Sequence, residues 1–134
     1  ETDGTVTPYD LGMGWIVGKA KKDFIGKRGL AREGLVAPGR KQLVGLLAKD
    51  GKTVLEEGAQ ITQSATPPPG TPALGHVTSA YDSATCGHPI ALAVIANGRA
   101  RIGETLHVPM PGGAIAVEVV APVFHDPKGE RLNG

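Results

Sequence analysis

The sequence predicts a mainly β fold: an antiparallel barrel or jelly-roll-like domain of six or seven strands after a short α-helical N-terminal segment. First, residues 40–134 hold six or seven short runs of strand-forming residues, which polar turns separate at close intervals. Second, 20 Gly and 11 Pro supply many turns, which suits short strands. Third, 40% hydrophobic and 20% charged residues describe a globular chain rather than a disordered one.

The first helical turn is expected in the N-terminal part of the chain, residues 1–36. Thr7 fits a helix N-cap, and Pro8 fits the first helical position, where no backbone N–H is needed. The Asp10 carboxylate can accept hydrogen bonds from the free N-terminal amides, as in a capping box. Gly12 then ends this helix after a short run.

A brief strand and a second helix are expected to follow. Residues 15–17 (Trp-Ile-Val) predict the strand, and residues 27–33 predict the helix, which Gly34 stops. The linker 35–40 contains Pro and Gly, and strands begin after it. The predicted division is therefore a segment 1–36 and a barrel domain 40–134.

The barrel strands are expected wherever apolar residues alternate or run together between turn signals. A Pro-rich stretch, residues 66–72, cannot be a central strand and predicts a stiff exposed loop, with a docking site for a proline-binding partner as the alternative. The predicted strands are residues 41–47, 59–63, 75–81, 90–96, 105–108 and 115–120, and residues 121–125 close the set.

Composition and spacing argue against several classes of function. A net charge of +1 gives no case for nucleic acid, and no apolar run approaches the length of a transmembrane helix. The single cysteine, Cys86, forms no disulfide within the chain, which fits a reducing, cytoplasmic compartment. No metal site is expected because the four histidines lack metal-ligand spacing; they are His76, His88, His107 and His125. No catalytic residue is predicted in this chain.

A basic run in the first third of the chain is the one candidate binding feature. Residues 1–52 hold ten Lys/Arg against six Asp/Glu, and five of these basic residues follow Trp15 closely. An ammonium group beside an aromatic ring can bind an aromatic ligand that carries a carboxylate. The alternative is that Trp15 is a core anchor and the basic side chains are solvated. The run comprises Lys19, Lys21, Lys22, Lys27 and Arg28.

The order of short motifs resembles the glycine-cleavage T-protein, or aminomethyltransferase, superfamily. The hallmark stretch is Thr-Pro at residues 7–8, Leu-Gly-Met-Gly-Trp at 11–15 and Lys-Asp-Phe-Ile-Gly-Lys at 22–27. The later motifs resemble strands of that family's C-terminal barrel; they lie at residues 43–46, 75–79, 90–93 and 122–124. The resemblance covers nearly the whole chain and departs from the family pattern at Cys86 and in the insertion 67–69.

Within that superfamily, residues 2–8, 39–46 and 75–81 are most similar to the alpha subunits of heterotetrameric sarcosine oxidases. Such a resemblance implies that sarcosine is oxidised at a flavin elsewhere in the complex, while tetrahydrofolate captures the one-carbon unit as methylenetetrahydrofolate. It also implies that FAD or FMN and NAD bind in other parts of the complex, and that the other subunits are partners. The tail of dimethylglycine dehydrogenase is the alternative.

The resemblance also assigns two residues of the basic run. Lys22 matches the position that lies near the glutamate tail of folate, and Trp15 matches the tryptophan after the glycine turn. The pterin-binding acid and the catalytic aspartate are implied upstream, so this fragment alone is expected to be inactive. Because the chain opens at Glu1 in an apparent loop, we expect a piece of a longer protein. The alternatives are a processed protein, an independent small binding protein and a purely structural or subunit-contact barrel.

Overall fold

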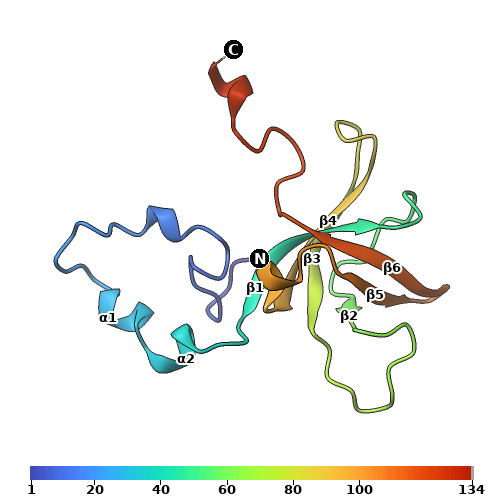
Figure 1. The fold of residues 1–134 in the computed structure, drawn as a ribbon, viewed down its shortest axis with the longest axis horizontal. Coiled ribbons are helices and arrows are strands. Elements are labelled where there is room, and N and C mark those ends of the chain that lie inside the picture. The colour runs from blue at the N-terminus through green and yellow to red at the C-terminus, as the bar shows by residue number, and fades with distance from the viewer. Residues whose placement is uncertain (134) are drawn as a thin grey trace.

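The computed structural model describes residues 1–133 and confirms the mainly β fold with few helices. Six strands form one sheet in which every pairing is antiparallel, and the order across the sheet is β2-β3-β4-β1-β6-β5 (Figure 1). The strands are β1 (Lys41–Ala48), β2 (Gln60–Ile61), β3 (Gly75–Ser83), β4 (His88–Ala96), β5 (Thr105–Met110) and β6 (Gly113–Val120). The predicted strands at these places are therefore confirmed, with β2 shorter and the others slightly longer.

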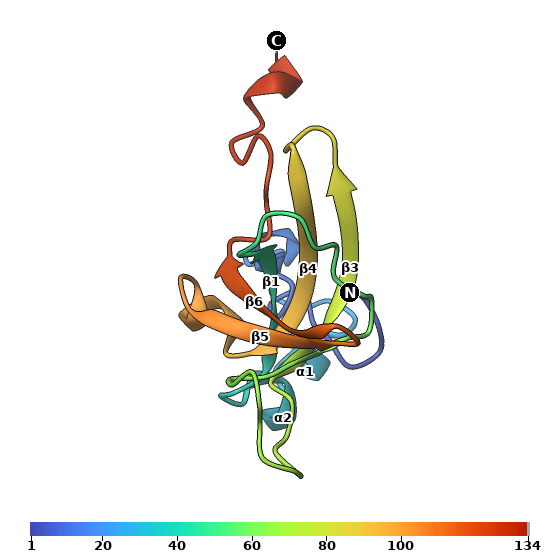
Figure 2. The same cartoon turned by 90° about the vertical axis from the view of Figure 1, so that its right-hand side faces the viewer.

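The sheet curls into a barrel-like shape but does not close. Its two end strands, β2 and β5, meet through a single isolated bridge between Thr62 and His107. The two residues exchange backbone hydrogen bonds of 2.8 Å and 3.0 Å. Figure 2 shows β5 and β6 crossing in front of the β3–β4 pair, so that the sheet wraps around a common interior.

The core fills that interior with small and branched apolar side chains. Each strand contributes alternate residues, as expected for a sheet with one face buried. On β4, however, Ala93, Val94 and Ile95 are buried in succession, as the near-continuous apolar run predicted. The largest fully buried side chains are Val44, Leu46, Ile61, Val77, Ile95, Leu106, Val108, Val117 and Val119.

The predicted closing strand at residues 121–125 is wrong. This segment crosses the outer face of β1 without forming a ladder, and Pro122 has no N–H to donate to one. Gly45 makes room for the crossing. A Cβ on Gly45 would lie 2.7 Å from the Phe124 ring and 2.7 Å from the Ala121 carbonyl oxygen.

The N-terminal segment is more irregular than the sequence predicts. The helix expected to begin at Thr7 is a series of hydrogen-bonded turns over residues 8–12. The expected strand at residues 15–17 is instead the 3-10 turn η1 (Gly14–Ile16). The expected helix at 27–33 is two single turns, α1 (Lys27–Leu30) and α2 (Glu33–Val36). Arg32 lies between them with extended backbone angles, which ends the first turn.

The other predictions outside the sheet are met in part. The Pro-rich residues 66–72 form a mostly exposed loop, as predicted, with a turn in which the Thr71 amide donates to the Pro68 carbonyl at 3.1 Å. Two further 3-10 turns are η2 (Gly98–Arg101) and η3 (Glu130–Asn133). Across residues 1–133, no helix combines the length and apolar character needed to cross a bilayer.

Candidate functional site

An ion pair attaches the N-terminal segment, residues 1–36, to the start of the barrel. Arg40 Nε donates to Asp10 Oδ1 at 2.9 Å, and Arg40 Nη2 donates to Asp10 Oδ2 at 2.5 Å. The same guanidinium binds the carbonyl oxygens of Gly34 at 2.9 Å and Thr5 at 2.8 Å. A planar guanidinium with several donors suits such a junction, because it binds a carboxylate side-on and still reaches other acceptors.

The predicted capping box supplies the other half of this junction. Asp10 Oδ2 accepts from the Thr7 amide at 2.8 Å and from the Thr7 hydroxyl at 2.9 Å, and the Asp10 amide donates back to Thr7 Oγ1 at 3.3 Å. Burial favours the neutral acid, but the hydrogen bonds from Arg40 and Thr7 outweigh it and hold the Asp10 pKa below its usual value. The bond to Asp10 raises the Arg40 pKa. The pair is therefore ionised at neutral pH.

Two further hydrogen bonds fix the same segment to the barrel. The Leu43 amide donates to the Asp10 carbonyl at 2.9 Å, and Arg99 Nη2 donates to the Tyr9 carbonyl at 2.6 Å. Arg99 is itself placed by its amide, which donates to Gln42 Oε1 at 3.0 Å. The position of Tyr9 relative to β1 and η2 is thus set by the barrel.

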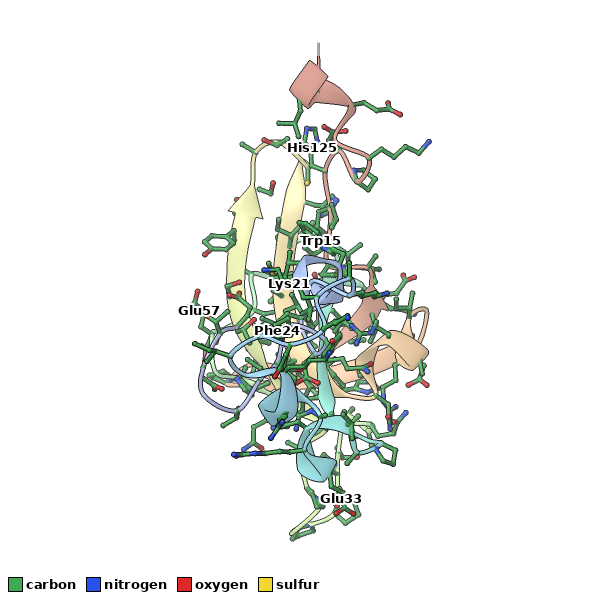
Figure 3. The ribbon with its side chains drawn as sticks, turned by 90° about the vertical axis from the view of Figure 1, so that its left-hand side faces the viewer. Trp15, Lys21, Phe24, Glu33, Glu57 and His125 are labelled. Carbon is green, nitrogen blue, oxygen red and sulfur yellow. The ribbon has the colours of Figure 1, made fainter. Side chains whose placement is uncertain are left out.

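Tyr9 forms one wall of an open groove in the N-terminal segment. The groove has a volume of about 350 Å³. Its apolar lining includes Tyr9, Val17, Phe24, Leu30 and Val36, and its basic lining consists of Lys19, Lys21 and Lys27. We call this feature the lysine-rimmed groove; Figure 3 shows Lys21 and Phe24 on the same face of the molecule. Ammonium groups beside apolar and aromatic surface can bind a flat ligand that carries carboxylates.

The structure does not bring the two sequence-predicted site residues together at this groove. Trp15 lies on η1 with 80% of its surface exposed. The alternative interpretation of Trp15, as a residue that anchors the core, is therefore wrong. Lys22 is exposed, and its carbonyl accepts a hydrogen bond from Lys27 Nζ. The Lys22 side chain lines a neighbouring open depression with Asp23 and Arg28, which shares Lys27 and Ala31 with the lysine-rimmed groove.

Sequence reasoning singled out the basic run but missed which of its members share a groove with apolar residues. Lys21 rather than Lys22 lines the groove, together with Phe24 and Tyr9. The available signal was the sparse apolar series Tyr9, Val17, Phe24 and Leu30, interleaved with lysines. Its spacing follows neither a helical nor a strand period, because the backbone here is a series of turns.

Other polar features of the described residues form no second candidate. A cavity of about 510 Å³ lies between residues 1–6 and the β3–β4 pair, with Arg40, Lys41 and His76 in its lining. Within residues 1–133, no three His, Cys, Asp or Glu side chains are grouped to hold a metal ion. Cys86 is half-buried in the β3–β4 hairpin loop, with its Sγ 4.0 Å from the Phe124 carbonyl oxygen.

The solved structure of the glycine cleavage system aminomethyltransferase T from Bartonella henselae has the same fold. It superposes with a TM-score of 0.69 at 22% identity, over 87% of this chain and 32% of that protein. Aminomethyltransferase of Saccharopolyspora erythraea is 35% identical over 93% of this chain and 32% of its own length.

Sarcosine oxidase alpha subunits match over a longer part of this chain. That of Corynebacterium sp. strain U-96 is 47% identical over 100% of this chain, and that of Rhizobium meliloti is 41% identical over 99%. This chain spans 14% of the length of each. The profile of the glycine cleavage T-protein C-terminal barrel domain matches residues 41–126. The chain therefore belongs to the glycine cleavage T-protein C-terminal barrel domain family.

Proposed function

We propose that this chain is the C-terminal part of a sarcosine oxidase alpha subunit and helps to form its tetrahydrofolate site. There the one-carbon unit from the oxidative demethylation of sarcosine would be captured as methylenetetrahydrofolate. The observation that carries the proposal is that 41–47% identity to sarcosine oxidase alpha subunits extends over 99–100% of this chain. The similarity therefore includes the N-terminal segment as well as the barrel.

The lysine-rimmed groove supports a role in binding part of the folate. Tetrahydrofolate has carboxylates at one end and a benzoyl ring in the middle. Lys19, Lys21 and Lys27 fit the carboxylates, and Phe24 fits an aromatic ring. Because the groove is open, we propose that it holds only this end of the ligand. The pterin-binding acid and the catalytic aspartate would come from upstream parts of the parent protein.

In this proposal the chain supplies no catalytic group of its own. FAD or FMN and NAD would bind in other parts of the complex, and other subunits of the oxidase would be partners. The parent enzyme would be cytoplasmic. The division into a segment 1–36 that ends the folate-binding domain and a barrel 40–134 is part of the same proposal.

Calorimetry with folinic acid, a stable tetrahydrofolate derivative, tests the proposal. Titration into the assembled oxidase should give heat of binding, and Lys21→Ala in the same assembly should weaken it. Arg32→Ala, which removes a charge from an exposed residue outside the groove, is the matched control. Unchanged affinity in the Lys21 variant would remove the groove from the folate site.

A purely structural role in subunit contact is the second candidate. It is favoured by the apolar surface that the N-terminal segment leaves exposed: Trp15 is 80% exposed and the Ile25 side chain is fully exposed. Two such side chains on one segment suit a surface that another part of the parent protein covers. In that case the Lys21 variant keeps its folate affinity, whereas Ile25→Ser destabilises the assembly.

A further inference from the structure

The barrel does not line the lysine-rimmed groove, so it can act on a ligand there only through the residues that form the walls. All of the lining residues belong to the N-terminal segment. Within the described residues 1–133, Tyr9 is the one lining residue that has a hydrogen bond to the barrel. A short turn outside a ladder is held less firmly than a sheet, so this bond decides how well the Tyr9 wall is fixed.

Arg99 makes this hydrogen bond, and the barrel fixes Arg99 in turn. Its Nη2 donates to the Tyr9 carbonyl at 2.6 Å, while its amide donates to Gln42 Oε1 on β1 at 3.0 Å. The turn η2, which carries Arg99, lies directly on β1. Gly98 is buried there, and a Cβ on it would lie 2.7 Å from the Gln42 carbonyl oxygen. The donor to Tyr9 therefore comes from a turn that is packed on the sheet.

The Tyr9 ring is held from another direction by Gly14, the first residue of η1. A Cβ at residue 14 would lie 2.7 Å from Tyr9 Cδ1 and 3.1 Å from Cε1, so the ring packs directly on the Gly14 backbone. Gly14 is not among the lining residues, so the ring forms the groove wall in front of it. Tyr9 keeps 44% of its surface exposed and is available to a ligand.

We propose that Arg99 is a positioning residue for the folate site. Its hydrogen bond to the Tyr9 carbonyl holds Tyr9 where the ring, resting on Gly14, packs against the benzoyl group of tetrahydrofolate. Aromatic pairs attract beyond the area that they bury only in particular geometries, so a fixed ring binds better than a mobile one. This inference rests on the proposed function, because it assigns Tyr9 a ligand contact in the same groove.

Arg101, on the same turn, is tied to the barrel alone and is the matched control. Its Nε donates to the Ala96 carbonyl at 2.9 Å, and its Nη1 donates to Gln63 at 3.1 Å and to Glu104 at 2.8 Å. None of these partners belongs to the N-terminal segment. The two arginines therefore share a turn and a charge but hold different parts of the molecule.

Titration of folinic acid into the assembled oxidase tests the role of Arg99. Arg99→Met removes the guanidinium and keeps the amide that binds Gln42, and it should weaken folinic acid binding about threefold or more. Arg101→Met should lower the thermal midpoint of the enzyme and leave the affinity unchanged. Unchanged affinity in Arg99→Met would overturn the inference, and so would equal losses of affinity in the two variants.

A Tyr9→Ala background separates positioning of Tyr9 from a general effect on stability. Tyr9→Ala itself should weaken folinic acid binding by about threefold to tenfold, the loss expected for one aromatic contact. Arg99→Met should then have no further effect, because the ring that it positions is absent. Gly14→Ala displaces the same ring and should weaken binding only when Tyr9 is present. An additive loss from Arg99→Met in the Tyr9→Ala background would contradict the inference.

Hydrogen exchange tests the positioning without any ligand. The Gly12 amide donates to the Tyr9 carbonyl at 3.3 Å and the Met13 amide donates to the Pro8 carbonyl at 2.7 Å, so both amides report on the turn at Tyr9. In the assembled oxidase they should exchange about threefold faster or more in Arg99→Met than in the unsubstituted enzyme. Unchanged exchange would show that Arg99 does not hold this turn.

The inference and the proposed function fail in different ways. Weaker folinic acid binding in Lys21→Ala, together with unchanged binding in Arg99→Met, would refute only the positioning role. Unchanged binding in Lys21→Ala would refute the folate groove, and the exchange experiment would still decide whether Arg99 fixes Tyr9.

Discussion

Arg40, the residue directly before β1, binds both carboxylate oxygens of Asp10, thirty positions earlier in the chain. The Asp10 side chain is only 6% exposed, whereas that of Arg40 is 21% exposed. The two partners are therefore not equivalent. Loss of Arg40 leaves a buried carboxylate without its cation, but loss of Asp10 leaves a guanidinium that water can still reach.

We expect Arg40→Met to reduce the free energy of unfolding by about 3 kcal/mol, because breaking a buried ion pair leaves an uncompensated charge. Asp10→Asn should cost less, since Arg40 retains the Thr5 and Gly34 carbonyls as acceptors. Urea unfolding followed by circular dichroism measures both values. Arg32→Met, a change at an exposed arginine, serves as the control. Equal losses of unfolding free energy in Arg40→Met and in the control would show that the Arg40–Asp10 pair does not stabilise the fold.

The Asp10 junction should weaken in acid. Its folded pKa lies below the ordinary value of 3.8, so the ionised form is favoured by folding. The stabilisation is complete above the unfolded pKa of about 4 and is lost as the pH falls through the folded pKa. Asp50, whose pKa is lowered to about 2 by hydrogen bonds from Thr53 and Lys52, acts in the same direction.

The measurement is hydrogen exchange of residues 5–12 as a function of pH, corrected for the intrinsic exchange rate. Protection should be constant from about pH 8 to 5 and should decline below about pH 4. The decline should largely disappear in Asp10→Asn and persist in Asp50→Asn, which lies outside the junction. A decline of equal size in Asp10→Asn would assign the acid sensitivity to other groups.

Gly45→Ala should destabilise the barrel by about 1–3 kcal/mol, the usual cost of overpacking. The new Cβ would lie 2.7 Å from the Ala121 carbonyl oxygen, and backbone moves less readily than a flexible side chain. Gly29→Ala in α1 meets no atom within 4 Å and should be neutral or slightly stabilising. Thermal unfolding of the two variants gives the comparison, and equal midpoints would contradict the close packing at Gly45.

Lys21→Ala should weaken folinic acid binding to the assembled oxidase by about tenfold, as expected for loss of one charged hydrogen bond. Lys22→Ala should have a smaller effect, because Lys22 lines a different depression. The two variants remove the same charge from adjacent residues, so each controls for the other. A larger loss in the Lys22 variant would favour the residue that the family resemblance assigns.

The strands could be predicted because their signals are local and repeat many times. Apolar residues between turn signals located all six strands. Only the short length of β2 could not be predicted, because it depends on where β3, its partner, begins. Residues 121–125 were misassigned because an apolar run next to Pro122 fits either a strand or a covering segment. The missing side chain of Gly45 leaves the space in which residues 121–125 cover β1, and this space distinguishes the covering segment from a strand.

The N-terminal segment was harder to predict, because distant residues determine its conformation. The motif from Thr7 to Asp10 correctly indicated a capping box, but no local pattern indicated that Arg40 would bind the same carboxylate. Trp15 and Lys22 lie seven positions apart, and Trp15 is not among the residues that line the depression at Lys22. Sequence spacing could not show that Lys21 and Phe24 share a groove with Tyr9.

The position of β1 in the middle of the sheet has a consequence for folding kinetics. β3 with β4 and β5 with β6 are hairpins that can form from neighbouring residues, but β1 must pair with β4 and β6, which lie much later in the chain. The chain loses conformational entropy when it closes these long loops, before the contacts of β1 can compensate for that loss, and this slows folding. We expect β1 to insert last, between two preformed hairpins, so that the whole domain folds in milliseconds to seconds. Substitutions at Val44 in β1 should therefore speed unfolding more than they slow folding.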